Sequence, residues 1–207
     1  MAFKVTMFSD FICPFCYIGF ETIRKLKPEF DLEVEWRGFE IHPEFPATGI
    51  PAEKIYGAAD SNARKAAWGR ISAMAEAAGI TMNPPSVLTN SHQALAVCEY
   101  ARETGRSEEF EERVYRAYFR EGANIGDLEM LKKLGAEAGL DPNEVEQAAR
   151  SPKYELKLKN NTLAAHSRGV SGVPTFFIGE FPLVGAQSED VMRQILARAI
   201  ERLGAAK

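Results

Sequence analysis

The chain has 207 residues, of which 45% are hydrophobic and 26% are charged. That length suits one domain with a sizeable core, and the composition excludes disordered and fibrous proteins. The formal net charge is −4 and lysine and arginine do not cluster, so we expect no nucleic-acid partner.

The first residues lead directly from Met1 into a predicted strand, without the charged, apolar and cleavage segments of a signal peptide. No apolar stretch is long enough to span a bilayer, so we also expect no membrane partner. Unless a leader precedes this sequence, these features predict a cytoplasmic protein. In that reducing compartment, two closely spaced cysteines are more typical of catalysis than of a structural disulfide.

The N-terminal region is expected to form a βαβ unit. Residues Phe3 to Phe8 alternate with a period of two, which is typical of a strand buried on at least one face. The apolar spacing after Pro14 predicts a helix that ends at Pro28, because proline discourages further helical turns. Residues Leu32 to Phe39 return to the period of two, so a second strand should lie parallel to the first.

The middle of the chain is expected to be helical. A polar passage from Ile41 to Pro51 predicts a loop that leaves the sheet. Apolar spacing and capping residues then predict helices over Ser61–Ala78, from the Asn90-Ser91 cap to near Gly105, from Ser107, from Asp127, from Pro142 and over Glu155–Arg168.

The C-terminal region is expected to form a ββα unit. Residues Gly172 to Gly179 predict a strand, and Leu183 to Gly185 should return antiparallel to it. Ser188 is then expected to cap a final helix. The apolar face of that helix carries Val191, Ile195, Leu196 and Ala199.

The two ends of the chain therefore supply strands, whereas the middle supplies helices alone. We expect an α/β fold in which a sheet domain, residues 1–45 and 165–207, is interrupted by an all-helical insertion, residues 46–164. No internal repeat and no low-complexity segment appears.

A dithiol lies at the junction of the first strand and helix, in the motif Cys13-Pro14-Phe15-Cys16. Unpaired N–H groups and the positive end of the dipole lie at a helix start, so they favour the thiolate of Cys13. Pro14 suits the first helical position because its φ is fixed and the missing N–H would have no partner. Cys16 lies one turn further along the same face, within reach of a mixed disulfide on Cys13. Cys13 is the predicted nucleophile and Cys16 the resolving thiol.

Zinc binding and a structural disulfide are the other common uses of a C-x-x-C motif. Zinc needs two more ligands at metal spacing, but Cys98 stands alone and no two of His42, His92 and His166 form a pair. A disulfide that closes so short a loop constrains the unfolded chain little. We therefore predict redox chemistry and no metal. Cys98 is interpreted as a small buried side chain, His42 as a loop residue, and His92 and His166 as surface residues.

Cys13-Pro14-Phe15-Cys16 after one strand and Val173-Pro174-Thr175 before another resemble the paired motifs of the thioredoxin fold. The helical insertion between them resembles that of the DsbA-type branch. More narrowly, the chain is similar to the FrnE-like group, whose superfamily includes 2-hydroxychromene-2-carboxylate isomerase and kappa-class glutathione transferase. The stretches that carry this likeness are Ser9 to Gly19, Asn90-Ser91 with Ala94-Leu95, Tyr118-Phe119, Gly172 to Phe176 and Gly185-Ala186-Gln187.

The resemblance implies a thiol–disulfide oxidoreductase or isomerase with a DsbA-like thioredoxin fold and no bound cofactor. It also implies a cis Val173–Pro174 peptide bond that faces the dithiol, since cis bonds are nearly confined to proline. The backbone of Val173 would then pair with an extended substrate beside Cys13. The alternative is an ordinary trans proline that starts an edge strand. The implied substrate-binding residues are Pro14, Phe15, Val173, Pro174 and Thr175.

Two features depart from the oxidising periplasmic relatives. Pro14-Phe15 replaces their Pro-His pair, so the Cys13 thiolate loses one stabilising group and we expect a less oxidising disulfide. The first strand also lacks a buried acid that would take the proton of Cys16. Asp10 or Glu40 is the expected substitute.

The runner-up function is a glutathione-dependent isomerase or transferase, in which the thiol of bound glutathione does the chemistry. Relatives with those activities replace the first cysteine by serine, whereas Cys13 and Cys16 are both present here. Gln187 and Ser188 are candidates to hold a glutathione carboxylate, although helix capping explains the same residues. A third class, a binding module with an apolar cleft, needs no dithiol. The expected partners are disulfide-containing proteins or low-molecular-weight thiols and disulfides, glutathione among them, bound by a monomer or homodimer.

Overall fold

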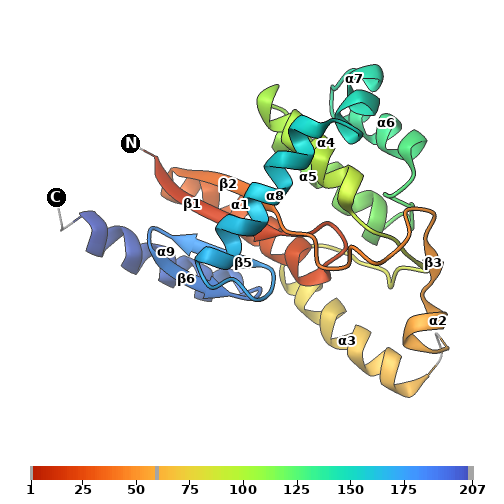
Figure 1. Cartoon of the computed structure of the whole chain (residues 1–207). Helices are drawn as coiled ribbons and strands as arrows, with labels where there is room; N and C mark the ends of the chain where they lie inside the picture. The colour runs from red at the N-terminus through yellow and green to blue at the C-terminus, as the bar shows by residue number, and fades with distance from the viewer. Residues whose placement is uncertain (1, 59–60, 205–207) are drawn as a thin grey trace.

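A four-stranded mixed sheet forms the centre of the structure, a computed structural model that describes residues 2–58 and 61–204. The strand order is β2-β1-β5-β6, with β1 and β2 parallel and the other neighbours antiparallel (Figure 1). The predicted βαβ and ββα units are confirmed. The strands are β1 (Phe3–Ser9), β2 (Leu32–Gly38), β5 (Thr175–Ile178) and β6 (Phe181–Val184).

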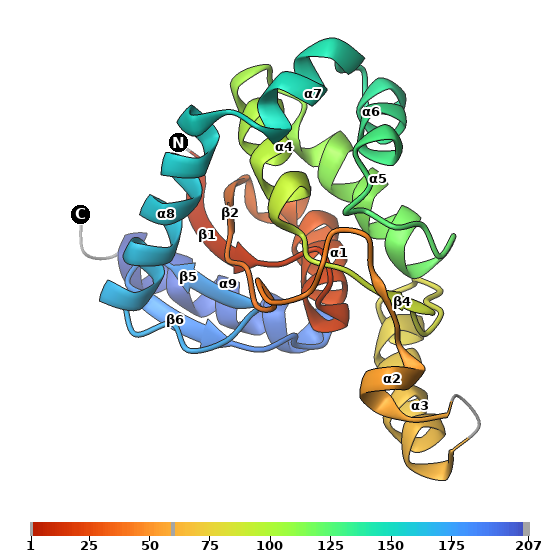
Figure 2. The ribbon, with the colours of Figure 1, turned by 45° about the vertical axis from the view of Figure 1, so that its right-hand side comes forward.

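Three helices cover this sheet. Helices α1 (Pro14–Phe30) and α9 (Glu189–Gly204) contact each other on one face, and α8 (Pro152–Ser167) crosses the other (Figure 2). Met7 belongs to the main core with residues of α1 and α9, whereas Phe8 forms a smaller cluster with Ala165 of α8. Successive residues of a strand point to opposite faces, so β1 is buried on both sides.

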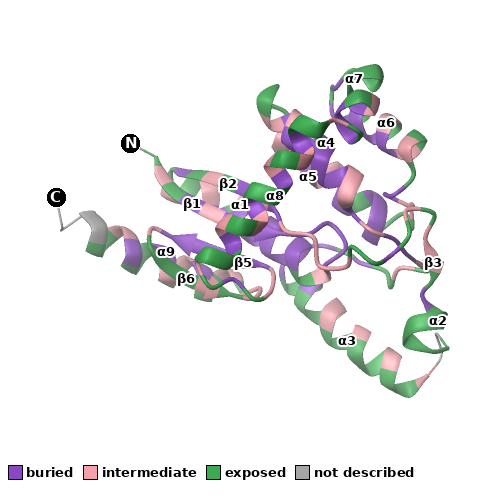
Figure 3. Cartoon of the chain, in the orientation of Figure 1, coloured by how far each residue is buried: buried purple, intermediate pink, exposed green. Residues whose placement is uncertain are grey.

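The helical insertion lies between β2 and α8. Its helices are α2 (Glu53–Tyr56), α3 (Asn62–Ala77), α4 (His92–Glu103), α5 (Ser107–Phe119), α6 (Leu128–Glu137) and α7 (Pro142–Ala149). Helices α4 to α7 pack against one another and lie above the sheet in Figure 1, while α3 stands away from them and carries mostly exposed and intermediate residues (Figure 3). The boundaries predicted for the insertion and the sheet domain stay a prediction.

The structure also contains elements that the sequence did not predict. Helix α2 is one, and the two-stranded antiparallel sheet of β3 (Ile50–Pro51) and β4 (Val87–Leu88) is another. Each of these strands has two residues, which is too short for a period of two to be visible. In the part of the chain that the structure describes, no helix has both the length and the apolar character needed to cross a bilayer.

Two details of the predicted helices are wrong. Helix α1 passes Pro28 and ends at Phe30, where Asp31 adopts a left-handed conformation (φ 48°) and its N–H bonds to the Lys27 carbonyl. A proline in the last turn removes only one helical hydrogen bond, so it does not stop the helix earlier. In α9, Ser188 caps the helix as predicted, but Met192 is buried and Val191 is 41% exposed.

A carboxyl group is buried in the core of the insertion. Glu111 of α5 is 4% exposed, and the Cys98 thiol of α4 donates to its Oε1 at 3.5 Å. Burial raises the pKa of Glu111 to about 8, although the positive charge of Arg102 opposes the shift. The predicted burial of Cys98 is confirmed, since its exposure is 0%.

This carboxyl group predicts a specific pH dependence of stability. The unfolded chain releases the proton near pH 4.5, whereas the folded protein keeps it to about 8, so stability falls as pH rises between those values. Within this window the free energy of unfolding should fall by ~1.4 kcal/mol for each pH unit, and we expect Glu111→Gln to remove most of that decline. Urea unfolding near both ends of the window measures the difference. Glu112→Gln, at the neighbouring position, is the control and should keep the wild-type pH dependence.

Candidate active site

Cys13 occupies the position just before the first turn of α1, as the sequence predicts. It is the N-cap residue, with extended backbone angles (φ −90°, ψ 116°), and Pro14 follows it as the first helical residue. No acidic residue lies in that first turn. The Cys13 side chain is 5% exposed, and its Sγ donates to the carbonyl of Val173 at 3.6 Å. The nucleophile predicted from the sequence therefore lies at the positive end of α1.

Cys16 lies one helical turn further on and has no exposed surface. The backbone N–H of Asp10 donates to its Sγ at 3.5 Å. Burial raises the pKa of the Cys16 thiol well above its ordinary value, and the neighbouring Cys13 raises it further. Both cysteines are free thiols that lie close together. The pair consists of one sulfur near the surface and one inside.

A hydrogen-bonded network beneath Cys16 links the sheet to the helical insertion. The Ser9 hydroxyl, at the end of β1, lies 2.7 Å from the hydroxyl of Tyr115 on α5. Tyr115 also donates to the Asp10 carbonyl at 3.4 Å. Its ring stacks on Tyr17 of α1 with 5.0 Å between centroids. No local sequence pattern indicates this contact, because Ser9 and Tyr115 are 106 residues apart.

Asp10 is the buried acid nearest the dithiol in sequence, and it has no exposed surface. Its carboxylate accepts the N–H of Ile12 at 3.3 Å and the N–H of Ile41 at 2.7 Å. Burial raises the pKa of Asp10 to about 6, against the effect of these hydrogen bonds. The carboxylate thus ties the loop before Cys13 to the loop after β2. Its role as the acceptor of the Cys16 proton stays a prediction.

The start of β5 lies against the start of α1. The Val173–Pro174 peptide bond is cis, and the Thr175 hydroxyl donates to the Gly172 carbonyl at 2.7 Å. Close contact here requires a glycine, because a Cβ on Gly19 of α1 would come within 2.9 Å of the Phe176 ring.

The structure brings the substrate-binding residues implied by the family, Pro14, Phe15, Val173, Pro174 and Thr175, to one end of the sheet with the dithiol. Phe15 is 38% exposed beside them. Their roles in binding remain predictions.

His92 keeps 36% of its side chain exposed, as its predicted surface position implies, and it also lies between two carboxylates. Its Nδ1 lies 3.1 Å from Glu40 and its Nε2 lies 2.7 Å from Glu155 of α8. The hydrogen bond that His92 donates to the Glu40 carboxylate raises the pKa of His92 to about 9, and Glu155 adds to this effect. His92 therefore joins the loop after β2 to α8.

Across residues 2–58 and 61–204, no group of three or more histidine, cysteine, aspartate and glutamate side chains could hold a metal ion.

Comparison with known proteins identifies the class. The family model for the DsbA-like thioredoxin domain matches residues 4–197, so the chain belongs to that family. The predicted α/β thioredoxin fold with a helical insertion is confirmed, as is the resemblance to the DsbA branch.

Individual proteins support this assignment. The chain is 30% identical over 200 residues to the uncharacterized protein YwbO of Bacillus subtilis (strain 168), covering 95% of this chain and 97% of YwbO. The crystal structure of the probable DsbA oxidoreductase SCO1869 from Streptomyces coelicolor is 28% identical in sequence and has a TM-score of 0.86. This match covers 95% of the present chain and 89% of SCO1869. A structure of 2-hydroxychromene-2-carboxylate isomerase, at 19% identity, has a TM-score of 0.79 over 99% of both chains, which shows a shared fold.

Proposed function

We propose that this protein is a thiol–disulfide oxidoreductase in which Cys13 attacks the substrate and Cys16 resolves the product. One observation carries the proposal: two free thiols lie one turn apart, with Cys13 at the helix start and Cys16 enclosed. A thiolate is the attacking species in disulfide exchange, and a helix N-terminus favours it. Membership of the DsbA-like family supports the same chemistry.

The reaction proceeds in two exchanges. The Cys13 thiolate attacks one sulfur of the substrate disulfide, which forms a mixed disulfide and releases the other half as a thiolate. Cys16 then gives up its proton and attacks Cys13, which closes the Cys13–Cys16 disulfide and releases the second half. Two electrons pass from the protein to the substrate. In the reverse direction the protein disulfide oxidises a substrate dithiol, and the redox poise of the compartment decides the direction.

The carbonyl of Val173 is the proposed anchor for the substrate. In the free protein this carbonyl accepts the Cys13 S–H. A mixed disulfide leaves no proton on Cys13, so the same carbonyl becomes available to a backbone N–H of an extended substrate. The Pro174 carbonyl does not compete with that of Val173 for the substrate N–H, because it already accepts the Gly185 N–H at 2.8 Å. Pro14 and Phe15 would contact the substrate from the other side.

A redox titration in glutathione buffer tests the proposal. The uncharged Phe15 stands where the strong oxidants have histidine, so we expect a potential between about −270 mV, as in thioredoxin, and about −120 mV, as in DsbA. Phe15→His should shift the potential toward that of the oxidants by about 30 mV or more, since an added positive charge stabilises the Cys13 thiolate. Phe15→Leu is the matched control and should stay near the wild type. A wild-type potential near about −120 mV would contradict the expected intermediate potential, whereas the absence of a reversible Cys13–Cys16 disulfide would contradict the oxidoreductase.

The runner-up is a glutathione-dependent isomerase or transferase. The shared fold with 2-hydroxychromene-2-carboxylate isomerase favours it, while the intact dithiol favours the oxidoreductase. Ser188 caps α9 by accepting the N–H of Val191 at 3.4 Å, and its O–H remains available to donate to a glutathione carboxylate. Assay of an isomerisable aromatic substrate with glutathione separates the two functions, because activity that persists in Cys13→Ser belongs to the runner-up.

A further inference from the structure

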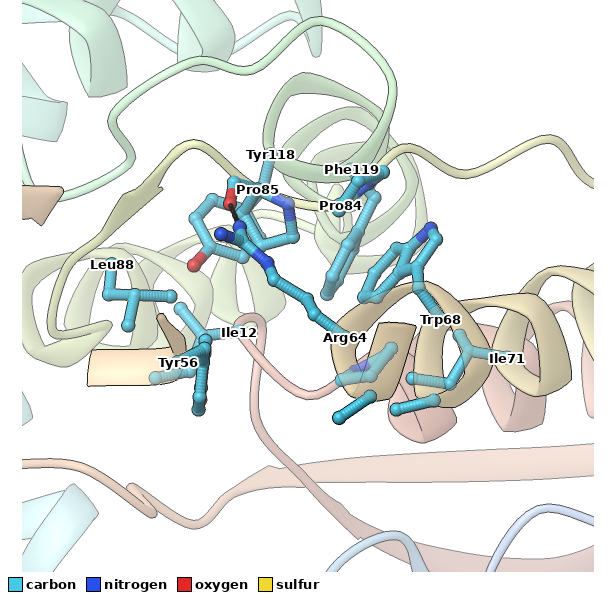
Figure 4. Close-up of a pocket in the computed structure, with 13 residues that line it drawn as sticks. Ile12, Tyr56, Arg64, Trp68, Ile71, Pro84, Pro85, Leu88, Tyr118 and Phe119 are labelled. Atoms are coloured by element: carbon cyan, nitrogen blue, oxygen red, sulfur yellow. Dashed lines mark hydrogen bonds between the residues drawn. The ribbon is translucent and has the colours of Figure 1, made fainter. Parts of the chain in front are cut away.

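A cavity adjoins the dithiol, between the start of α1 and the helical insertion. Its volume is about 390 Å³, and Ile12 and Pro14, the two neighbours of Cys13 in sequence, form part of its wall. The opposite wall comes from α3 and α5 (Figure 4). Cavities that hold small ligands have volumes of roughly 300–1,000 Å³. This α3 cavity therefore borders the segment that carries Cys13.

The lining of the α3 cavity is largely aromatic. The rings of Tyr56, Trp68, Tyr118 and Phe119 line it, together with aliphatic side chains such as Ile71. Tyr56 is 54% exposed, so part of this aromatic surface is open to solvent rather than packed in the core. Aromatic side chains bind another ring by offset stacking or by edge contacts. The lining favours a flat apolar group.

Arg64 of α3 adds a positive charge to this lining. Its side chain extends from the helix toward Pro85 and Tyr118 (Figure 4). The guanidinium donates to the carbonyl of Gly57 at 3.1 Å and to the carbonyl of Pro85 at 3.4 Å. Both acceptors are neutral, so neither cancels the charge. A carboxylate in the cavity would meet the fork of N–H donors that binds carboxylates best.

We propose that the α3 cavity binds the half of the substrate disulfide that becomes attached to Cys13, and that this half carries an aromatic ring and a carboxylate. The ring stacks among the aromatic side chains and the carboxylate pairs with Arg64. The inference deepens the function proposed above and depends on it. Cys13 forms the new S–S bond to this half while the other half leaves as a thiolate. Attack by Cys16 then releases the bound half as a second thiolate.

Three disulfides test the proposal on the reduced full-length protein. Dithiobis(nitrobenzoate) has a ring and a carboxylate on each half, dithiodipyridine has a ring alone, and hydroxyethyl disulfide has neither. We expect Arg64→Gln to slow the reaction with dithiobis(nitrobenzoate) about tenfold relative to dithiodipyridine, the loss of one charge-assisted contact. The ratio cancels any effect of Arg64 on Cys13 itself. Arg70→Gln, an exposed arginine of α3 outside the lining, is the matched control and should leave the ratio unchanged.

A second variant tests the aromatic part of the proposal. Ala67→Phe places a ring inside the cavity, at an exposed position of α3 that tolerates substitution. It should slow both aromatic disulfides several-fold and leave hydroxyethyl disulfide unaffected. Equal ratios in Arg64→Gln and Arg70→Gln would overturn the proposal while reaction with all three disulfides still upholds the oxidoreductase. Failure of Cys13 to react with any of them would instead overturn the proposed function.

Discussion

The Cys13→Ser variant is expected to lose turnover of disulfide substrates entirely, because a serine hydroxyl is not ionised at the helix start and cannot form the mixed disulfide. Cys16→Ser should behave differently. Its Cys13 still attacks, but no second thiol releases the product, so the substrate stays attached. Intact-mass spectrometry without reductant measures the trapped species, and an insulin-reduction assay measures turnover.

Cys98→Ser is the control for this pair of variants. Cys98 is also fully buried, but it lies on α4 and bonds to Glu111 rather than to the dithiol. Activity should therefore persist in Cys98→Ser. Full activity in Cys13→Ser would remove the role given to that residue. Equal rates of alkylation at Cys13 and Cys16 would also contradict the model, since Cys16 is enclosed and its pKa is raised.

The parts of the fold that follow local rules could be predicted from sequence. The period of two in β1 and β2 and the capping residues of the helices depend on neighbours along the chain. Asp127 and Asp141 cap α6 and α7 with their side chains, as their position before a helix indicates. The dithiol belongs to this group as well, because Cys13 and Cys16 are placed by a single helix start.

The rest of the site depends on contacts that no local pattern records. The sequence pattern places Tyr115 on the buried face of α5, but it does not indicate that the Tyr115 hydroxyl forms a hydrogen bond with Ser9 beneath the dithiol. His92 reads as an exposed residue, yet it lies between two carboxylates from distant segments. From sequence, Arg64 is a charged residue on an alanine-rich helix. The packing of α3 places it in the lining of the cavity whose wall includes Ile12 and Pro14. The insertion thus contributes to the site through side chains whose partners are set by tertiary packing.

The proton of Cys16 has to leave before this sulfur can attack, and that requirement gives Asp10 a testable role. The pKa of Cys16 is raised by burial, so water alone removes its proton slowly at neutral pH. Asp10 is buried in the loop between β1 and α1, and its backbone N–H donates to the Cys16 sulfur. With a pKa of about 6, its carboxyl group is ionised at neutral pH and still basic enough to take a proton.

We expect Asp10→Asn to slow the resolving step about a hundredfold, the lower end of the range for a general base. In the wild type this step should accelerate as pH rises through about 6, where Asp10 loses its proton, and the variant should lack that dependence. Stopped-flow release of the second thiolate from a preformed mixed disulfide measures it. Glu40→Gln tests the other candidate acceptor: the charge of Glu40 raises the pKa of Asp10, so if Asp10 is the base, this variant should move the midpoint to lower pH and keep the plateau rate. A variant that is slow by the same factor at every pH would mean that Asp10 only holds the loop, through its hydrogen bonds to Ile12 and Ile41.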